Sequence, residues 1–307
     1  MTSIIFPGQG SQYVGMAKDF YENFNQSKLV FEEIENILSM NLKKIIFEDE
    51  GKKINITNIT QICIFTSSLS IYKAFESEFD LSKINNMFGH SLGEYLSLTA
   101  SNKISISDCV KLIQIRGNLM NSAVEPNLTG MAALIGKNCN YVEDIIKKNN
   151  LNLEIANDNS PIQVVISGSN KDINESENVI IKAGIKKIVK LNVSAAFHSS
   201  FMSEAENKLN QYINDINLNS NKISIISNFD AHLTNENLKI LDSLKKQMSN
   251  RVRWTESIQN LEKTGNKKII EIGPGKVLSG LINRISSFFD IISINKVDDL
   301  KQLNNNV

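Results

Sequence analysis

Apolar residues along the chain fall into short runs that end at glycine turns and into longer stretches with helical spacing. Residues 3–6 form an apolar run stopped by P-G-Q-G, which predicts a strand followed by a turn. Helical spacing begins near residue 16 and returns over 60–75. Residues 86–89 then lead through Ser91 into E-Y-L-S-L-T-A-S, which has no helix breaker. This part of the chain therefore predicts strand, tight turn and helix.

The pattern changes in the middle of the chain, where the predicted elements are short. Their order is strand, helix, strand, strand, helix, strand, over residues 131–136, 141–148, 153–157, 162–168, 171–184 and 185–193. That order is typical of a ferredoxin-like domain. We therefore predict a small domain at 127–193, inserted into a larger α/β domain made of 1–126 and 194–307. The run K-K-I-I-E-I-G-P-G-K-V-L near the C-terminus predicts a return to the main sheet.

Composition narrows the class of protein. A chain of 307 residues with 41% hydrophobic residues can form about two globular domains. Lys+Arg and Asp+Glu both total 33, so no net field favours nucleic acid or an anionic membrane. The three cysteines show no C-x-x-C spacing, which argues against a disulfide framework or a zinc site. With no signal peptide and no membrane-spanning apolar run, the expected location is the cytoplasm.

The tract G-H-S-L-G contains the first candidate for chemistry, Ser91. A G-x-S-x-G turn between strand and helix exposes the serine hydroxyl at a sharp bend. The N–H of Leu92 would then lie at a helix start, where unpaired N–H groups favour an oxyanion. The alternative is an ordinary strand–helix turn, and the pentapeptide alone leaves both open.

A serine nucleophile needs a base, and the chain has three histidines. His90 adjoins the serine, and adjacent side chains in a sharp turn tend to diverge. His232 lies in a polar connecting stretch that is typical of a surface histidine. His198 lies where the small domain rejoins the large one, and domain junctions favour ligand sites. His198 is thus the candidate base, with a structural histidine as the alternative.

Arg116 is the most informative single residue. Residues 108–123 predict a helix with Ser107 as N-cap, and the same-side neighbours of Arg116 are all apolar: Leu112, Ile113, Leu119 and Met120. A guanidinium on a core-facing stripe requires a partner. An internal ion pair or a snorkelling side chain would supply one. A guanidinium in a cleft can instead grip a carboxylate by two parallel hydrogen bonds, which suggests an acyl group with a free carboxylate.

Several tracts together resemble the malonyl-CoA:acyl carrier protein transacylase family. They are F-P-G-Q-G-S-Q, G-H-S-L-G-E-Y, R-G at 116–117, N-D-N-S-P-I-Q-V-V-I-S-G, F-H at 197–198, Q-M-S-N-R-V-R-W and E-I-G-P-G-K-V-L. The resemblance runs over nearly the whole chain in family order. It implies an α/β fold with an α/β-hydrolase-like large domain and a ferredoxin-like (βαββαβ) insert.

The resemblance also implies roles for individual residues. Ser91 would be the nucleophile, His198 the general base and Arg116 the clamp for the malonyl carboxylate. The backbone N–H groups of Gln9 and Leu92 would stabilise the oxyanion. The Gln247 carbonyl would orient the histidine, and Asn159 would be a polar residue of the pocket. One departure is Arg251, which stands where many relatives have proline, and it weakens the inference for Gln247.

The implied activity is transfer of a malonyl group from malonyl-CoA, through a Ser91 ester, to the phosphopantetheine thiol of an acyl carrier protein. No metal or bound cofactor is implied, and a monomer is expected. The tract S-A-A-F-H-S-S-F-M is similar to that of free-standing, trans-acting malonyl acyltransferases of polyketide synthases. Phe197 would fill the space that an α-methyl branch needs. Fatty-acid and polyketide pathways both remain open.

Three other functions compete with this reading. An acyl hydrolase of the same family would use the same Ser–His pair but has no special need of Arg116. A general α/β-hydrolase esterase shares the serine turn but neither Arg116 nor the insert. A non-catalytic subunit that only docks carrier protein would not need Ser91 and His198.

Overall fold

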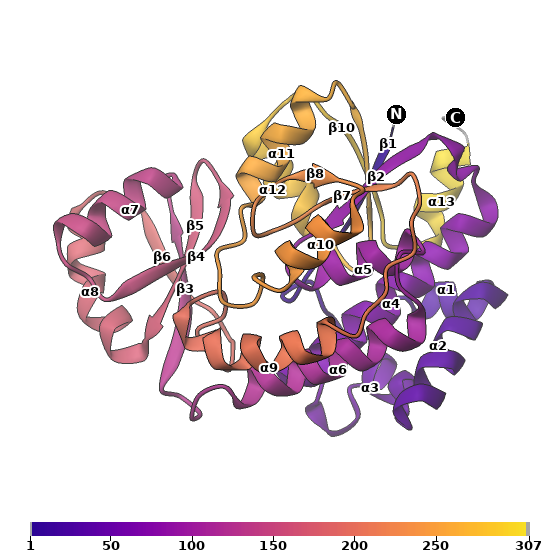
Figure 1. Ribbon diagram of the computed structural model, residues 1–307, viewed down its shortest axis with the longest axis horizontal. Helices are drawn as coiled ribbons and strands as arrows, with labels where there is room; N and C mark the ends of the chain where they lie inside the picture. The colour runs from indigo at the N-terminus through magenta and orange to yellow at the C-terminus, as the bar shows by residue number, and fades with distance from the viewer. Residues whose placement is uncertain (1, 305–307) are drawn as a thin grey trace.

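The computed structural model of the protein describes residues 2–304. It has two β-sheets, and Figure 1 shows them in two lobes that lie side by side. The small lobe comprises the elements between residues 129 and 190, and the large lobe comprises the elements before and after it. Within residues 2–304, no helix combines the length and apolar character needed to span a membrane.

The large lobe is built on a six-stranded sheet. Its order is β10-β9-β1-β2-β7-β8, parallel except for β8, which pairs antiparallel with β7. The strands are β1 (Thr2–Phe6), β2 (Ile84–Gly89), β7 (Ser224–Ile226), β8 (Leu233–Thr234), β9 (Lys268–Ile272) and β10 (Asp290–Ile294). Central β1 is buried along its whole length, which matches the apolar run that predicts it.

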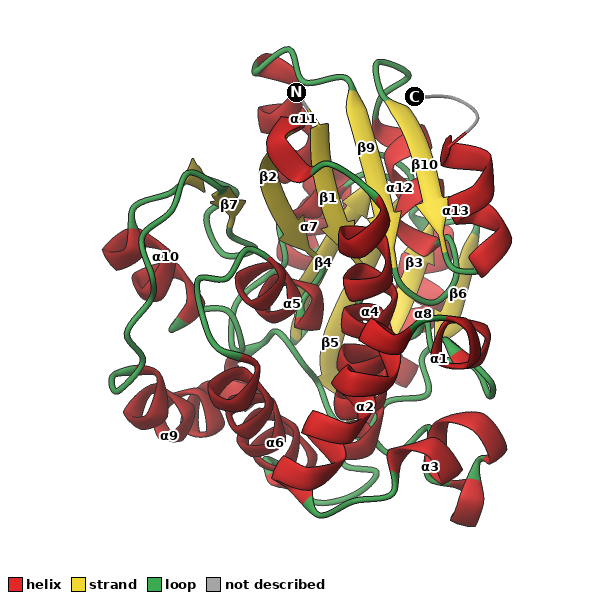
Figure 2. Ribbon diagram, turned by 90° about the vertical axis from the view of Figure 1, so that its right-hand side faces the viewer, coloured by secondary structure: helices red, strands yellow, loops and turns green. Residues whose placement is uncertain are grey.

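Helices cover both faces of this sheet, as Figure 2 shows. Alternation along β1 divides its side chains between two cores: Ile4 and Phe6 join the core with α2 and α4, and Ile5 joins the core with α11 and α12. The helices are α1 (Lys18–Asn23), α2 (Asn25–Leu38), α3 (Leu42–Glu48), α4 (Thr57–Glu78), α5 (Leu92–Ala100), α6 (Ile106–Ser122), α9 (Ser203–Ile213), α10 (Asn237–Leu244), α11 (Trp254–Lys263), α12 (Val277–Ile285) and α13 (Val297–Asn304), with short 3-10 turns η1 (Glu50–Lys52), η2 (Leu81–Lys83) and η3 (Ser200–Met202).

The start of α6 differs from the sequence-based prediction. The N-cap is Ser105 rather than Ser107, and the helix begins at Ile106. The Asp108 backbone N–H donates to Ser105 Oγ (3.0 Å), and Ser105 Oγ donates to the Asp108 carboxylate (2.7 Å). The first bond is an N-cap bond, which satisfies one free backbone N–H of the helix start, and the second holds the Ser105 side chain in place.

The small lobe contains β3 (Thr129–Ile135), α7 (Cys139–Lys148), β4 (Leu153–Ser160), β5 (Gln163–Ser169), α8 (Asn170–Lys182) and β6 (Lys187–Lys190). Its antiparallel sheet has the order β4-β5-β3-β6. One face packs on α7 and α8 through Ala132, Leu134 and Ile166. The opposite face contributes Met131 and Val165 to the large-lobe core, so the lobes share apolar packing.

Backbone pairing also joins the lobes beside β4. The Val252 N–H donates to the Ala156 carbonyl (2.8 Å), and the Asp158 N–H donates to the Val252 carbonyl (2.9 Å). A segment of the large lobe thus extends the small sheet edge by one bridge. This junction lies two residues after Asn250, whose carbonyl oxygen contacts His198.

Candidate active site

Ser91 occupies a sharp turn between β2 and α5. Its backbone angles, φ 52° and ψ −104°, lie outside the regions that non-glycine residues normally populate. The flanking glycines permit this turn, because a Cβ at Gly89 would lie 2.4 Å from the Gly93 backbone and one at Gly93 would lie 2.1 Å from the Phe6 carbonyl oxygen. The G-x-S-x-G spacing thus reflects close approach of the helix start to the two central strands.

Two side chains from distant parts of the chain hold the strained residue at both ends. The Ser91 N–H donates to Asn228 Oδ1 (2.6 Å), and Gln247 Nε2 donates to the Ser91 carbonyl (2.9 Å). Asn228 Nδ2 also donates to the Gly89 carbonyl (2.7 Å). Strain of this kind persists only where surrounding contacts over-determine it, and it gathers at functional sites.

His198 lies against the serine hydroxyl. Ser91 Oγ and His198 Nε2 are 2.9 Å apart, and His198 Nδ1 lies 2.9 Å from the Gln247 carbonyl oxygen and 3.2 Å from that of Asn250. Both carbonyls can only accept, so Nδ1 carries the proton and Nε2 is free to accept from the serine. Burial, reinforced by the Arg116 charge, lowers the His198 pKa to about 3, which keeps the imidazole neutral at physiological pH.

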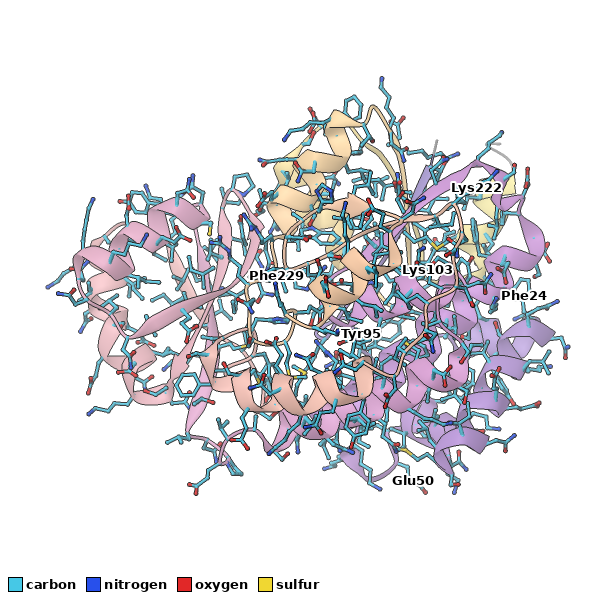
Figure 3. The ribbon with its side chains drawn as sticks, in the orientation of Figure 1. Phe24, Glu50, Tyr95, Lys103, Lys222 and Phe229 are labelled. Carbon is cyan, nitrogen blue, oxygen red and sulfur yellow. The ribbon has the colours of Figure 1, made fainter. Side chains whose placement is uncertain are left out.

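Arg116 is 1% exposed and points at the serine from α6. One terminal nitrogen donates to Gln61 Oε1 (2.6 Å), and the other donates to Ser91 Oγ and to Gln247 Oε1 (3.0 Å each). Its guanidinium carbon lies 5.1 Å from the centre of the Tyr95 ring, which Figure 3 labels inside the large lobe. Every acceptor is neutral, and no described carboxylate forms an ion pair with it.

A cavity of about 360 Å³ opens over these groups. Its lining includes the predicted oxyanion donors, nucleophile, base, carboxylate clamp and aromatic pocket residue: Gln9, Leu92, Ser91, His198, Arg116 and Phe197. The Leu92 N–H belongs to the first residue of α5. The structure therefore brings together these residues from four separate segments around one pocket.

Asn159 is placed differently from the expectation. It is not among the described residues that line the cavity, where Asn157 lies instead. Asn159 Oδ1 is 2.9 Å from His90 Nε2, so its amide is engaged with the histidine that adjoins the serine. Asn159 lies at the second of two register irregularities in β4, where the strict alternation of side chains along the strand is interrupted. His232, the third histidine, is exposed.

Three polar residues at the site were not found from the sequence: Gln61, Glu94 and Asn228. Glu94 is fully buried, and its Oε2 accepts from Gln247 Nε2 (2.7 Å) and the Asn228 N–H (3.0 Å). A chain of contacts thus runs from Glu94 through Gln247 to Arg116. Of the three, Glu94 could have been found from the sequence, because it is a charged residue in the otherwise apolar start of α5, directly after G-H-S-L-G.

Burial raises the pKa of Glu94 to about 7 from its ordinary 4.5. Between these two pH values, the Glu94 carboxyl therefore keeps its proton in the folded protein and has lost it in the unfolded chain. Stability from this group is therefore present at low pH and lost as pH rises from about 4.5 to about 7. Glu94→Gln removes this loss. We expect the unfolding free energy of the variant relative to the parent to rise by about 2 kcal/mol between about pH 5 and pH 8. Urea unfolding of both proteins at the two pH values measures it, and parallel changes would contradict the shift.

Comparisons with known proteins agree with this geometry. The family model described as acyl transferase domain matches residues 4–291. A malonyl CoA-acyl carrier protein transacylase of Staphylococcus aureus is 36% identical over 310 residues, covering 99% of each chain. The crystal structure of a protein of that name from Clostridium perfringens superposes with TM-score 0.93 at 34% identity, covering 99% of this chain and 96% of that one.

A malonyl-transacylase solved in complex with its type II polyketide synthase acyl carrier protein superposes with TM-score 0.94 at 29% identity, covering 100% of this chain and 99% of that one. The family match and these likenesses span nearly all of the chain, the serine turn and the histidine included. The chain therefore belongs to the acyl transferase domain family.

Proposed function

We propose that the protein is a malonyl-CoA:acyl carrier protein S-malonyltransferase, acting in fatty-acid or polyketide biosynthesis. The single observation that carries the choice of acyl group is Arg116. A guanidinium that is 1% exposed, lies 3.0 Å from the nucleophile and has only neutral acceptors is a costly arrangement without a ligand. A malonyl carboxylate supplies the missing counter-charge at the distance of a short acyl chain from Ser91.

In the first half-reaction, His198 Nε2 accepts the proton of Ser91 Oγ while the oxygen attacks the thioester carbonyl of malonyl-CoA. The resulting oxyanion lies near two backbone N–H groups. One belongs to Leu92, the first residue of α5, and the other to Gln9, which also lines the cavity. Its collapse breaks the carbon–sulfur bond. The leaving thiolate of CoA takes the proton from His198 and departs, and the malonyl group remains as an ester on Ser91.

The second half-reaction runs the same steps with a different thiol. His198 removes the proton of the phosphopantetheine thiol carried by the acyl carrier protein, and the sulfur attacks the Ser91 ester. The second tetrahedral intermediate collapses by breaking the bond to Ser91 Oγ, which regains its proton from His198. These steps use protein groups alone, and the one prosthetic group arrives on the partner.

Phe197 supports preference for malonyl over branched donors. It is buried, lines the pocket and directly precedes the base. An α-methyl branch on the donor would compete with its ring for space, and steric exclusion discriminates more strongly than a missing contact. Malonyl-CoA is thus proposed as the donor that the pocket accepts.

The two lobes support the proposed domain division into 1–126 with 194–307, and 127–193. All four strands of the small sheet fall between residues 129 and 190. The sheet order β4-β5-β3-β6 with two helices on one face supports a ferredoxin-like small domain. The mainly parallel sheet with a serine turn after β2 supports an α/β-hydrolase-like large domain.

A panel of acyl donors tests the proposal. The purified protein is given malonyl-, methylmalonyl- or acetyl-CoA together with holo acyl carrier protein, and loaded carrier and free acid are measured. We expect malonyl loading to exceed both other donors by at least about tenfold and to exceed malonate release. Free malonate formed faster than loaded carrier would identify a hydrolase instead.

A further inference from the structure

We propose that Arg251 and Glu143 form a positioning pair, which holds the small lobe against the segment that orients the catalytic histidine. The orienting segment is defined as residues 247–252. The inference rests on the proposed function, because its subject is how His198 is kept in place to accept the Ser91 proton. It concerns Arg251, which stands where many members of the family have proline.

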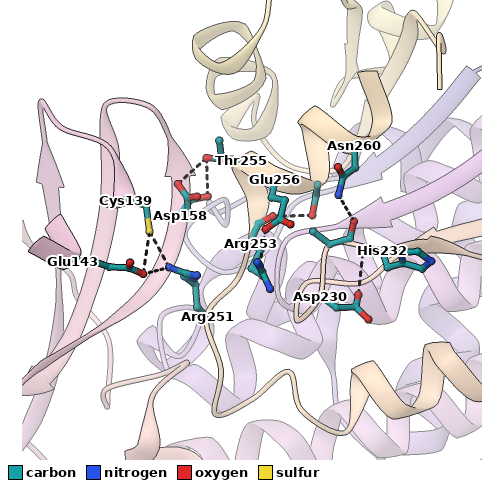
Figure 4. A network of polar contacts seen from close by, with 12 residues as sticks. Cys139, Glu143, Asp158, Asp230, His232, Arg251, Arg253, Thr255, Glu256 and Asn260 are labelled. Atoms are coloured by element: carbon teal, nitrogen blue, oxygen red, sulfur yellow. Dashed lines mark hydrogen bonds and ion pairs between the residues drawn. The ribbon is translucent and has the colours of Figure 1, made fainter. Parts of the chain in front are cut away.

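The pair bridges the two lobes. Arg251 Nη1 lies 2.5 Å from Glu143 Oε1 and 3.0 Å from Cys139 Sγ, and both partners belong to α7 (Figure 4). The Cys139 pKa is raised to about 11 by burial, so this side chain is a neutral thiol and Glu143 supplies the charge. The link is therefore an ion pair between a large-lobe segment and a small-lobe helix.

Arg251 lies between two contacts that matter for the site. The preceding residue, Asn250, has its carbonyl oxygen 3.2 Å from His198 Nδ1. The following residue, Val252, exchanges backbone hydrogen bonds with Ala156 and Asp158 of β4. A shift of Arg251 therefore moves the Asn250 carbonyl, and with it one of the two acceptors that hold the Nδ1 proton.

The orienting segment is restrained from both lobes. On the large-lobe side, the Ser249 N–H donates to Glu206 Oε2 (2.8 Å), Ser249 Oγ donates to Glu206 Oε1 (2.7 Å), and Asn250 Nδ2 donates to the Lys246 carbonyl (2.9 Å). Between α10 and α11 the segment contains no regular helix or strand, and Figure 4 shows Arg251 on an extended loop that faces the small lobe. The Gln247 carbonyl is held through its own residue, whose side chain binds Ser91, Glu94 and Arg116. Arg251, directly after Asn250, adds the side-chain contact that ties this segment to α7 of the small lobe.

The expected effect is moderate, because the side chains of Arg251 and Glu143 are 31% and 35% exposed. A partly exposed ion pair contributes up to about 1 kcal/mol, which corresponds to about fivefold in rate. Misorientation of the base affects the chemical step for every acyl donor alike. This separates a positioning role from the carboxylate clamp, whose loss affects acid-tipped donors far more than acetyl.

The experiment compares Arg251→Met, Glu143→Gln and the double variant, with Arg253→Met as the matched control. Arg253 lies two residues after Arg251 and forms a similar ion pair with Glu256 (2.7 Å), but both of its partners belong to the large lobe (Figure 4). Single-turnover acylation of Ser91 is measured with malonyl-CoA and with acetyl-CoA, alongside urea unfolding. Arg251→Lys, which keeps the charge, is included as the conservative variant.

We expect Arg251→Met and Glu143→Gln each to slow acylation about three- to fivefold with both donors, with KM changed less than twofold. The double variant should lose no more than either single one, and Arg251→Lys should recover most of the rate. Additive losses, a loss equal to that of Arg253→Met, or a change confined to unfolding would overturn the inference. A parent protein that does not acylate Ser91 would instead refute the proposed function.

Discussion

Replacing Arg116 with alanine is expected to lower malonyl transfer by about 10²- to 10³-fold, while acetyl transfer falls by less than about tenfold. The malonyl carboxylate loses two charge-assisted hydrogen bonds, each worth about 1.5–3 kcal/mol. The acetyl donor has no carboxylate to lose them. Initial rates of carrier-protein loading with both donors measure the ratio directly.

The acetyl donor serves as an internal control for damage to the fold, which matters because Arg116 is buried and contacts Gln61 and Gln247. Arg116→Lys adds a second control, since lysine keeps the charge but not the planar fork. Its malonyl rate should lie between those of the parent and the alanine variant. Equal losses for malonyl and acetyl in both variants would show that Arg116 is structural and not a clamp.

Replacing His198 with alanine is expected to slow acylation of Ser91 by about 10³- to 10⁴-fold. Without Nε2 at 2.9 Å, the serine hydroxyl has no neutral base to take its proton, and its remaining neighbour, Arg116, can only donate. Substrate binding should change little, because the loss concerns the chemical step. Rapid-quench measurement of the acyl-enzyme separates the two quantities.

His232→Ala is the matched control for this variant, because the His232 side chain is exposed and lies outside the residues that line the cavity. It should retain the parent rate. A His198→Ala variant within tenfold of the parent would mean that another group activates the serine.

The parts of the site that sequence could predict are those that local patterns determine. The serine turn follows from glycine spacing and from a strand–helix change, both legible within ten residues. The position of Arg116 follows from helical periodicity, since its same-side neighbours are apolar and α6 forms over 106–122. The small lobe follows from the order of its six short elements.

The parts that sequence could not predict depend on contacts between distant segments. Gln61 lies on α4, where polar and apolar residues alike are buried, so no amphipathic stripe distinguishes the face toward Arg116. Asn228 lies in a connecting stretch after β7, yet it holds the Ser91 N–H. Their roles depend on tertiary packing, which local propensity and periodicity do not encode.

At Arg251, the sequence led to too weak an inference, again because a contact between distant segments could not be predicted. The departure of Arg251 from the resemblance weakened the inference for Gln247, whose carbonyl nevertheless lies 2.9 Å from His198 Nδ1. The partner of Arg251, Glu143, is 108 positions away on a small-lobe helix. A proline would restrain the loop through its ring, whereas arginine leaves φ free and is held by an external ion pair.

In the proposed reaction, Ser91 carries the malonyl group between two thiols. The most direct measurement is intact-protein and peptide mass spectrometry after brief incubation with malonyl-CoA, followed by addition of holo acyl carrier protein. We expect a single malonyl adduct on the Ser91 peptide, which disappears as an equal amount of malonyl appears on the carrier protein. No adduct on Ser91, or an adduct that decays to malonate without loading the carrier, would contradict it.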